Sequence, residues 1–327
     1  MRWWLAICLL ALGLMVGCSK SEDKAKKYAA KCLDDSAEPD NEICEKACDA
    51  GDGESCKELF LQLMLHGPEL VPDGPNQTTF QEPHYQRAYA ILEKGCKTGY
   101  LECCGMLAGA QSKGIGTPTN KMLALKTHRK ACEKGYQPCC TQLGVELVFG
   151  DVPNLDRGLE LLRSSCDAGE GEGCAYLATV YEQGKWVKKD IAKGRALLQK
   201  GCDASEKVCC LRLGKIYLDL SDTGVRDVER GLKLLEKGCE LRSQDSCVAL
   251  IVTYGGKFPF VAKDEAKSFH YAEKSCALHE DGCFILALYH HRGLGTPKDP
   301  EKTRAILNKY CHAGHQQFCD EKQRLGL

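Results

Sequence analysis

The sequence predicts an all-α solenoid built from two-helix hairpins, and three repeating features predict it. Cysteines recur in pairs seven or eight residues apart, and from the second pair on the pairs recur every 34 to 37 residues. A helix-capping type of residue stands twelve positions before most of these pairs. A period of this length is typical of helix–turn–helix repeats, so the 327 residues are expected to form one array rather than two or three ordinary domains.

The 23 cysteines of the chain point to disulfides. Zinc sites rely on closely spaced C-x-x-C pairs, and the sequence has none. Two thiols that flank a glycine-rich turn instead suit a clip across the corner of a helical hairpin, which requires an oxidising compartment. Metal binding and free thiols are the alternatives; we expect neither a metal nor a cofactor. The expected disulfides are Cys48–Cys56, Cys96–Cys104, Cys132–Cys140, Cys166–Cys174, Cys202–Cys210, Cys239–Cys247, Cys276–Cys283 and Cys311–Cys319.

Five cysteines of the expected mature chain remain without an assigned partner. Cys32 and Cys44 could bridge each other, although Cys44 stands where later repeats have a core leucine and could equally be a buried thiol. Cys103, Cys139 and Cys209 each precede a paired cysteine at the start of the second helix. There the helix N-terminus could activate a thiol, whereas a semi-buried inert thiol or an alternative disulfide partner is the simpler interpretation.

The N-terminus indicates the compartment. A basic start is followed by an apolar run, Trp3 to Val16, that is too short to span a bilayer. It ends in Leu14-Met15-Val16-Gly17-Cys18, which resembles a bacterial lipobox. We therefore expect residues 1–17 to be a signal peptide, Cys18 to be lipidated, and residues 18–35 to form a tether with a short N-terminal helix. A plain signal peptide or an uncleaved anchor is the alternative.

Each repeat is expected to begin with a helix of about three turns that ends at the first cysteine of its pair. The residues twelve positions before that cysteine are Ser36, His84, Asn120, Asn154, Asp190, Asp227, Asp264 and Asp299, and all but the histidine are N-cap types. Two positions before the cysteine stand Lys46, Lys94, Lys130, Lys200, Lys237, Lys274 and Lys309. A cation in the last turn meets the negative end of the helix dipole, so we assign these lysines to helix termination rather than to a ligand site.

The interior of the repeats is expected to be filled by small residues and leucines. Small residues four positions after the cap let neighbouring helices approach, and leucines four positions before the cysteine fill the remaining space. The second helix is expected to open at the second cysteine of each pair, with a leucine three residues later. Tyr181, Tyr217 and Tyr254 then lie four residues further, on the same helix face.

These positions resemble a known family. The pattern L-(G/A)-x-x-Y-x-x-G-x-G-T-x-x-D-x-x-K is similar to the Sel-one-like repeat, a relative of the tetratricopeptide repeat, and the added cysteine pairs resemble the Helicobacter cysteine-rich protein family. The resemblance covers residues 36–327 and implies an α/α superhelical solenoid of about eight disulfide-clipped hairpins. It also implies a secreted or periplasmic protein. Some members of the family have been described as penicillin-binding β-lactamases, and others as host-interacting or assembly factors.

Two segments depart from the pattern. The first interval is longer than the others, and the excess falls in residues 66–84, which contain four prolines and are expected to form a loop. The last hairpin, residues 299–327, has Lys322 where other repeats have leucine. A polar final helix is what a capping repeat needs.

We expect no catalytic residues. Penicillin-recognising serine enzymes use S-x-x-K, S-D-N and K-T-G, of which the chain has Ser21-Glu22-Asp23-Lys24 and Lys97-Thr98-Gly99. The first string falls in the tether and the second in a hairpin turn, whereas the chemistry needs a buried helix start facing a strand. The adjacent His290 and His291 are expected to serve packing or surface roles rather than metal binding.

The sequence thus predicts an envelope lipoprotein that binds partners on its solenoid surface. Ser19 after the lipobox cysteine resembles outer-membrane sorting, facing the periplasm or the cell surface. The expected ligands are a protein, a peptide or a peptidoglycan-like glycan, and the lipid supplies membrane attachment. A net charge of −1 gives no electrostatic case for nucleic acid. The alternatives are weak β-lactam binding or hydrolysis, and a role in redox or metallocofactor assembly.

Overall fold

The computed structural model describes residues 27–32, 41–65, 83–150, 153–218 and 226–327. Within these ranges the chain is helical throughout and contains no strand, which confirms the all-α repeat fold. The expected signal peptide, the lipidation site Cys18 and most of the expected loop 66–84 lie outside the described residues. Pro83 and His84 are an exception, because they already belong to a helix, so that loop ends earlier than expected.

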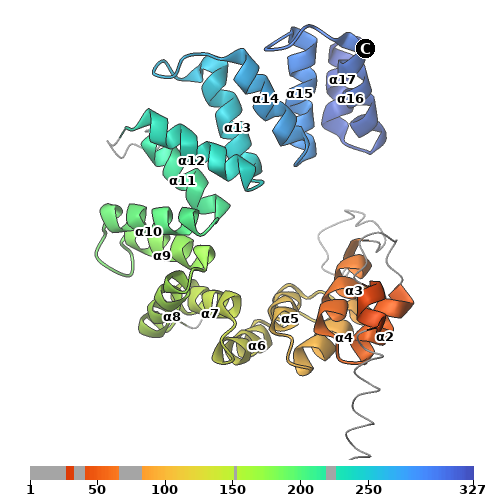
Figure 1. Cartoon of the computed structure of the whole chain (residues 1–327), viewed down its shortest axis with the longest axis vertical. Helices are drawn as coiled ribbons and strands as arrows, with labels where there is room; N and C mark the ends of the chain where they lie inside the picture. Colours follow the sequence, from red (N-terminus) through yellow and green to blue (C-terminus); the bar gives the residue numbers. More distant parts are fainter. Residues whose placement is uncertain (1–26, 33–40, 66–82, 151–152, 219–225) are drawn as a thin grey trace, which may run out of the picture. The chain divides into compact units, whose positions relative to one another are not determined.

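Consecutive helices pair as antiparallel hairpins joined by short turns (Figure 1). The chain divides into two compact units, 1–161 and 162–327. The first unit contains α2 (Asn41–Asp49), α3 (Gly53–Leu65), α4 (Pro83–Lys97), α5 (Leu101–Lys113), α6 (Lys121–Glu133), α7 (Gln137–Phe149) and the start of α8 (Leu155–Asp167).

The second unit continues the same pattern from the end of α8. It contains α9 (Gly171–Gln183), α10 (Ile191–Asp203), α11 (Lys207–Tyr217), α12 (Val228–Glu240), α13 (Gln244–Val252), η2 (Thr253–Lys257), α14 (Glu265–Cys276), α15 (Glu280–Arg292), α16 (Pro300–His312) and α17 (Gln316–Arg324). The element η2 is a single π-helical turn that extends α13.

The expected caps begin most of the first helices. Asn120 Oδ1 accepts a hydrogen bond from the backbone N–H of Leu123, and five later caps accept in the same way from the residue three positions on. These five are Asn154, Asp190, Asp227, Asp264 and Asp299. His84 is not a cap, because α4 already begins at Pro83, and Ser36 lies outside the described residues.

Each hairpin is closed by a disulfide at its corner. All eight expected pairs are bonded, with Cα–Cα distances of 4.1 to 4.8 Å. The second cysteine does not open its helix, as the sequence suggested, but lies three residues inside it; α5, for example, starts at Leu101 and carries Cys104. In the chain-entropy account, closing a loop of this length contributes about 2.6 kcal/mol.

The spacing of the cysteines depends on one left-handed residue in the turn. In the seven hairpins with a separation of eight, the residue three positions after the first cysteine has a positive φ, for example Gly135 at 88° and Arg242 at 62°. In the Cys276–Cys283 hairpin, where the separation is seven, His279 holds this position at φ −158°. One residue fewer in the turn therefore removes the left-handed step.

The core is built from the expected leucines and small residues. The leucines four positions before the first cysteine, Leu92, Leu162, Leu198, Leu235 and Leu307, are all fully buried. The small residues after the caps are buried too, and Gly231 shows why: a Cβ there would lie 2.8 Å from Leu218 Cγ on the preceding helix. Because larger side chains would separate the helices, this face of the first helix accepts only small residues.

A second set of small residues controls how closely the two helices meet beside each disulfide. In five hairpins the residues just before the two bonded cysteines face each other, and a glycine on one helix lies opposite a serine or cysteine on the other. Gly95 faces Cys103 and Gly201 faces Cys209, whereas Ser165 faces Gly173. A Cβ on Gly95 would lie only 2.6 Å from Cys103 Sγ. Cys103 and Cys209 thus fill the space left by a glycine opposite them.

This complementarity predicts the outcome of a swap in the second unit. Gly201→Ser should destabilise the protein by about 1–3 kcal/mol, because its side chain overlaps Cys209 Sγ. Adding Cys209→Gly, which reproduces the Ser165/Gly173 arrangement, should recover a large part of that loss. Chemical denaturation of the four proteins of the double-mutant cycle measures the coupling. Additive effects of the two substitutions would show that the pair does not share one space.

Tyrosines link neighbouring hairpins in the second unit. Lys193 Nζ lies 4.2 Å above the centre of the Tyr181 ring, and the same contact recurs for Arg230 with Tyr217 and for Lys267 with Tyr254. In each case the cation belongs to the first turn of the helix that follows the tyrosine. These cation–π contacts explain the recurrent tyrosines as links between hairpins.

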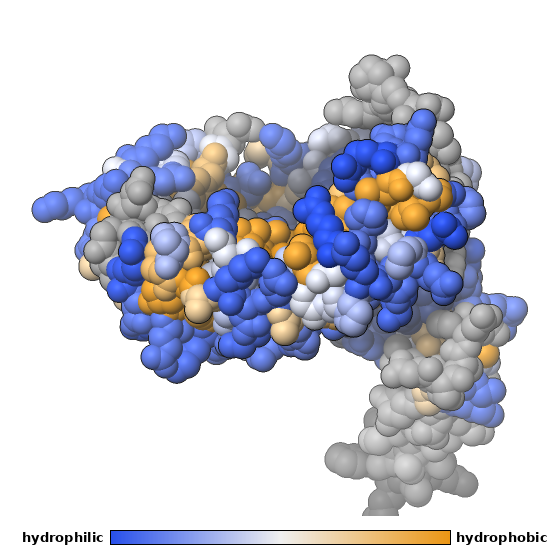
Figure 2. Space-filling model, turned by 90° about the horizontal axis from the view of Figure 1, so that it is seen from above, coloured by the Kyte–Doolittle hydropathy of each residue, from blue (hydrophilic) through white to orange (hydrophobic). Residues whose placement is uncertain are grey.

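The last helix, α17, presents a mostly polar surface. In α17 only Phe318 and Glu321 are buried, and Phe318 stacks on Tyr310 with ring centroids 4.8 Å apart. These two aromatic rings occupy the positions that hold small residues in the other hairpins. Across the visible face of the molecule, apolar patches are scattered among hydrophilic side chains (Figure 2).

Candidate functional site

The main candidate site is a groove of about 450 Å³ in the first unit, between the α4–α5 hairpin and α6. We call it the α4–α6 groove. It is lined by Glu93, Cys96, Lys97, Leu101, Cys104, Leu107, Lys130, Ala131, Glu133 and Lys134. Its volume lies in the range of ligand-binding clefts in proteins.

The floor of the α4–α6 groove is apolar and held rigidly. The Cys96–Cys104 disulfide crosses it, and Cys104 is almost completely buried. Leu107 is also buried, while Leu101 is half-buried at the first position of α5. Because the disulfide fixes α4 against α5, the floor is formed before any ligand arrives.

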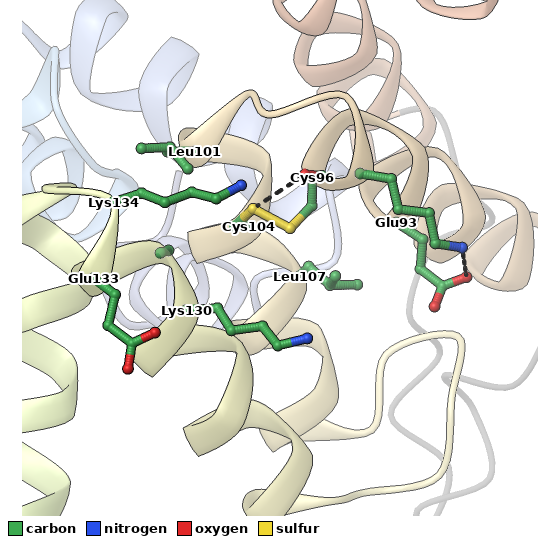
Figure 3. A pocket seen from close by; sticks show the side chains of 10 residues that line it. Glu93, Cys96, Leu101, Cys104, Leu107, Lys130, Glu133 and Lys134 are labelled. Atoms are coloured by element: carbon green, nitrogen blue, oxygen red, sulfur yellow. Dashed lines mark hydrogen bonds and ion pairs between the residues drawn. A yellow bond between two sulfur atoms is a disulfide. The ribbon is translucent and has the colours of Figure 1, made fainter.

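Charged side chains stand around this floor (Figure 3). Lys130 and Lys134 extend over it from α6 and the residue that follows, and the ammonium group of Lys134 lies near the disulfide. On the α4 side, Lys97 Nζ lies 3.8 Å from a carboxylate oxygen of Glu93. The groove therefore has an apolar floor with cations on both sides, which suits a ligand with apolar and anionic groups.

The residues of the K-T-G string lie at this groove rather than on a strand. Lys97 is the last residue of α4 and lines the groove, and Thr98 Oγ1 donates a hydrogen bond to the carbonyl of Gly95. Thr98 is thus engaged with the helix end. Ser21 lies outside the described residues. The sequence did not single out Lys97 as a groove residue, because only the packing of α6 on the α4–α5 hairpin creates the groove.

A cysteine and a histidine that are eleven residues apart meet in α6 and α7. The distance from His128 Nδ1 to Cys139 Sγ is 3.4 Å, and both side chains are buried. Burial raises the pKa of the Cys139 thiol to about 12 and lowers the pKa of His128 to about 4. Both groups are therefore neutral at physiological pH, whereas an activated thiolate–imidazolium pair needs shifts of the opposite sign.

The other two unpaired cysteines are equally inert. Burial raises the pKa values of Cys103 and Cys209 to about 12, with a smaller contribution from nearby glutamates. Their thiols point to the backbone carbonyls of Gly53 and Gly171. The hypothesis of a thiol activated by a helix N-terminus is wrong for all three residues, because desolvation outweighs the helix dipole. Cys32 and Cys44, for which the sequence left two alternatives, are joined by a disulfide.

The histidine pair in α15 does not form a ligand site. His290 is buried and meets the edge of the Phe269 ring at a centroid distance of 5.3 Å. Burial lowers its pKa, so the ring packs as a neutral aromatic group. Within the described residues, no group of three or more histidine, cysteine or acidic side chains is arranged to hold a metal ion.

The fold and the groove define a class of protein: a disulfide-rich helical repeat scaffold that binds other proteins. Segments 3–31, 101–136, 137–170, 171–206, 207–243, 252–279 and 281–315 match the Sel1 repeat. The chain belongs to the Sel1 repeat family. The first of these segments spans most of the expected signal peptide and of the expected tether, and it lies mostly outside the described residues.

Solved structures share this fold. A Sel1 repeat protein from Oxalobacter formigenes has 15% sequence identity and a TM-score of 0.55, with 93% of this chain and 86% of that chain covered. A protective antigen with an SLR fold from uropathogenic Escherichia coli, c5321, has 18% identity and a TM-score of 0.51, covering 90% of this chain and 69% of that one. No curated protein matches the chain.

Cysteine-rich protein B from Helicobacter pylori is similar over a shorter stretch. Its identity is 32%, its TM-score 0.33, and the match covers 39% of this chain and 92% of that chain. Nine disulfides join described residues here, and such bonds persist in oxidising compartments. The disulfides therefore indicate an extracytoplasmic protein. In the described part of the chain, every helix is too short or too polar to span a bilayer.

The boundaries of the Sel1 repeats show which parts of the array the disulfides connect. Five of the seven matched segments start at or next to the start of a second helix and end after the next first helix; segment 137–170, for example, contains α7 and α8. Cys132 and Cys140 therefore belong to different Sel1 repeats, as do Cys166 and Cys174. The disulfides thus connect successive repeats, where solenoid proteins are held by packing alone.

The three unpaired thiols should react slowly in the folded protein. With pKa values near 12, only about one thiol in 10,000 is ionised at pH 8. We expect iodoacetamide to label Cys103, Cys139 and Cys209 in denaturant within minutes, but hardly at all under native conditions. Labelling followed by peptide mapping measures both rates. Rapid native labelling of Cys139 with a plateau near neutral pH would contradict the assignment of a neutral pair.

Proposed function

We propose that the chain is an envelope-anchored scaffold that holds a protein, peptide or peptidoglycan-like ligand in the α4–α6 groove. The observation that carries the proposal is the groove itself, whose apolar floor is fixed by a disulfide and flanked by lysines. Membership of the Sel1 repeat family supports a binding role, because stacked helical repeats commonly present binding surfaces.

Binding rather than turnover fits the chemistry of the described residues. The cysteine and histidine that lie within reach of each other, Cys139 and His128, are both held neutral by burial. Lys97 lies at the edge of the groove next to Glu93, where the lysine is well exposed. A cation in this position can attract an anionic group of a ligand.

Anchoring at Cys18 is the second part of the proposal. The lipobox-like sequence before Cys18 supports cleavage and lipidation, and Ser19 supports outer-membrane sorting. Oxidising conditions in the envelope agree with the nine disulfides. A tether of small and charged residues, 19–27, would keep the repeats away from the membrane surface.

Photocrosslinking in intact cells tests the groove. A photoreactive amino acid at Glu133, which lines the groove, should trap a partner, whereas the same amino acid at Met122 should not. Met122 lies on the same helix, is 65% exposed and does not line the groove, so it controls for random contacts. Mass spectrometry identifies the trapped species. Equal crosslinking at both positions would remove the groove from the proposal.

Replacement of the lipobox cysteine tests the anchor. Cys18→Ala should prevent lipid attachment, so the variant should stay as unprocessed precursor or leave the membrane fraction, and it should lose incorporation of labelled fatty acid. Electrophoretic mobility, fractionation and metabolic labelling report the three effects separately. If the variant keeps the same mobility, location and labelling as the wild-type protein, anchoring through Cys18 is wrong.

A further inference from the structure

A recurring ion pair joins neighbouring hairpins at their disulfide ends. The lysine two positions before the first cysteine of one hairpin contacts the acidic residue directly after the first cysteine of the preceding hairpin. Lys200 Nζ lies 2.6 Å from Asp167 Oδ1, and Lys237 Nζ lies 3.8 Å from Asp203 Oδ1. Lys94 and Asp49 form the same pair in the first unit. The recurrent lysines, assigned above to helix termination, therefore also bridge hairpins.

The α4–α6 groove interrupts this series. Lys130 is the next lysine in the series after Lys94, but the position that should hold its acidic partner is occupied by Lys97. Both lysines line the groove. Within the described ranges, no carboxylate lies within 4 Å of the Lys130 ammonium group. A pair of opposite charges has thus become a pair of like charges.

A third lysine adds to the positive charge of the groove, and the nearby glutamates do not neutralise the three lysines. Lys134 lines the same groove and extends toward the disulfide (Figure 3). Glu93 interacts with Lys97 only at 3.8 Å, and the carboxylate of Glu133 is turned away from the lysine ends. In the preceding hairpin contact, by comparison, the carboxylate of Asp49 neutralises Lys94 directly. Three ammonium groups therefore surround an apolar floor.

Like charges held in one groove repel each other, and a ligand carboxylate between them relieves that repulsion. We propose that the α4–α6 groove binds an acidic peptide segment whose carboxylates take the place of the missing aspartate. Alternate apolar side chains of the segment contact Leu101, Leu107 and the disulfide. The proposal rests on the scaffold function above and specifies the class of its ligand.

A peptide-binding experiment distinguishes recognition of carboxylates from non-specific binding. The probe is a fluorescein-labelled peptide with the sequence Glu-Ala-Glu-Leu-Glu-Ala-Glu, and its counterpart has glutamine in place of every glutamate. Fluorescence anisotropy with the mature full-length protein should show binding of the acidic probe that weakens as salt is added. The glutamine peptide should bind far more weakly. A labelled single-stranded oligonucleotide, measured in the same assay, tests whether the lysines bind nucleic acid instead.

A charge reversal that restores the ion-pair series tests the site. Lys97→Asp recreates the arrangement of Asp49, Asp167 and Asp203 opposite the next lysine, so the fold should be kept. Affinity for the acidic probe should fall about tenfold, because one attraction is lost and one repulsion is gained. Lys215→Asp makes the same change of net charge on an exposed residue of α11 that does not line the groove, and should leave affinity unchanged.

Every other outcome of these binding assays overturns the proposal, and each does so for a different reason. Equal loss in the Lys97→Asp and Lys215→Asp proteins would show that only net charge matters, and tighter binding of the oligonucleotide would assign the lysines to nucleic acid. Equal binding of the glutamine peptide would remove acidic specificity and leave the scaffold function intact. Circular dichroism checks folding, and Lys130→Gln gives a second, milder test if Lys97→Asp is unfolded.

Discussion

The closeness of two helices at each disulfide corner is the constraint on which the rest of this structure depends. A three-residue turn with a left-handed residue brings the cysteines within disulfide reach, and the bond then holds the helix ends together. In five hairpins one of the two residues just before the bonded cysteines is a glycine, whereas the last hairpin holds two stacked rings there, Tyr310 and Phe318. Gly201 with Cys209 and Ser165 with Gly173 are two solutions to the same lack of space.

The same corner sets the electrostatics between hairpins. Because the disulfide fixes where each first helix ends, the acidic residue after one cysteine meets the lysine before the next in three hairpin contacts, as Asp167 meets Lys200. At Lys97 a lysine stands in place of the acidic residue, so a cluster of cations replaces the structural ion pair. A structural repeat can thus acquire a binding site without a change of fold, since the groove beside Lys97 and Lys130 uses the same helices as its neighbours.

Burial decides the chemistry of the cysteines more strongly than their position along the helix. Cys139 lies near a helix N-terminus and beside His128, an arrangement that would activate an exposed thiol. In the packed interior both groups are kept neutral, and the thiol acts as a small apolar side chain. The oxidised cysteines, in contrast, connect one Sel1 repeat to the next and oppose the repeat-by-repeat unfolding to which solenoids are prone.

The sequence by itself determined the helical repeat, the N-caps from Asn120 to Asp299 and the buried leucines, because each depends on local spacing. Spacing also identified the eight bonded cysteine pairs, since both partners lie at one corner. Only the tertiary structure showed that Cys32 bonds Cys44, that Cys139 faces His128, and that Lys97 replaces an acidic partner of Lys130. These relations depend on how a helix packs against a neighbouring hairpin and on how deeply side chains are buried. Neither can be read from the spacing of residues along the chain.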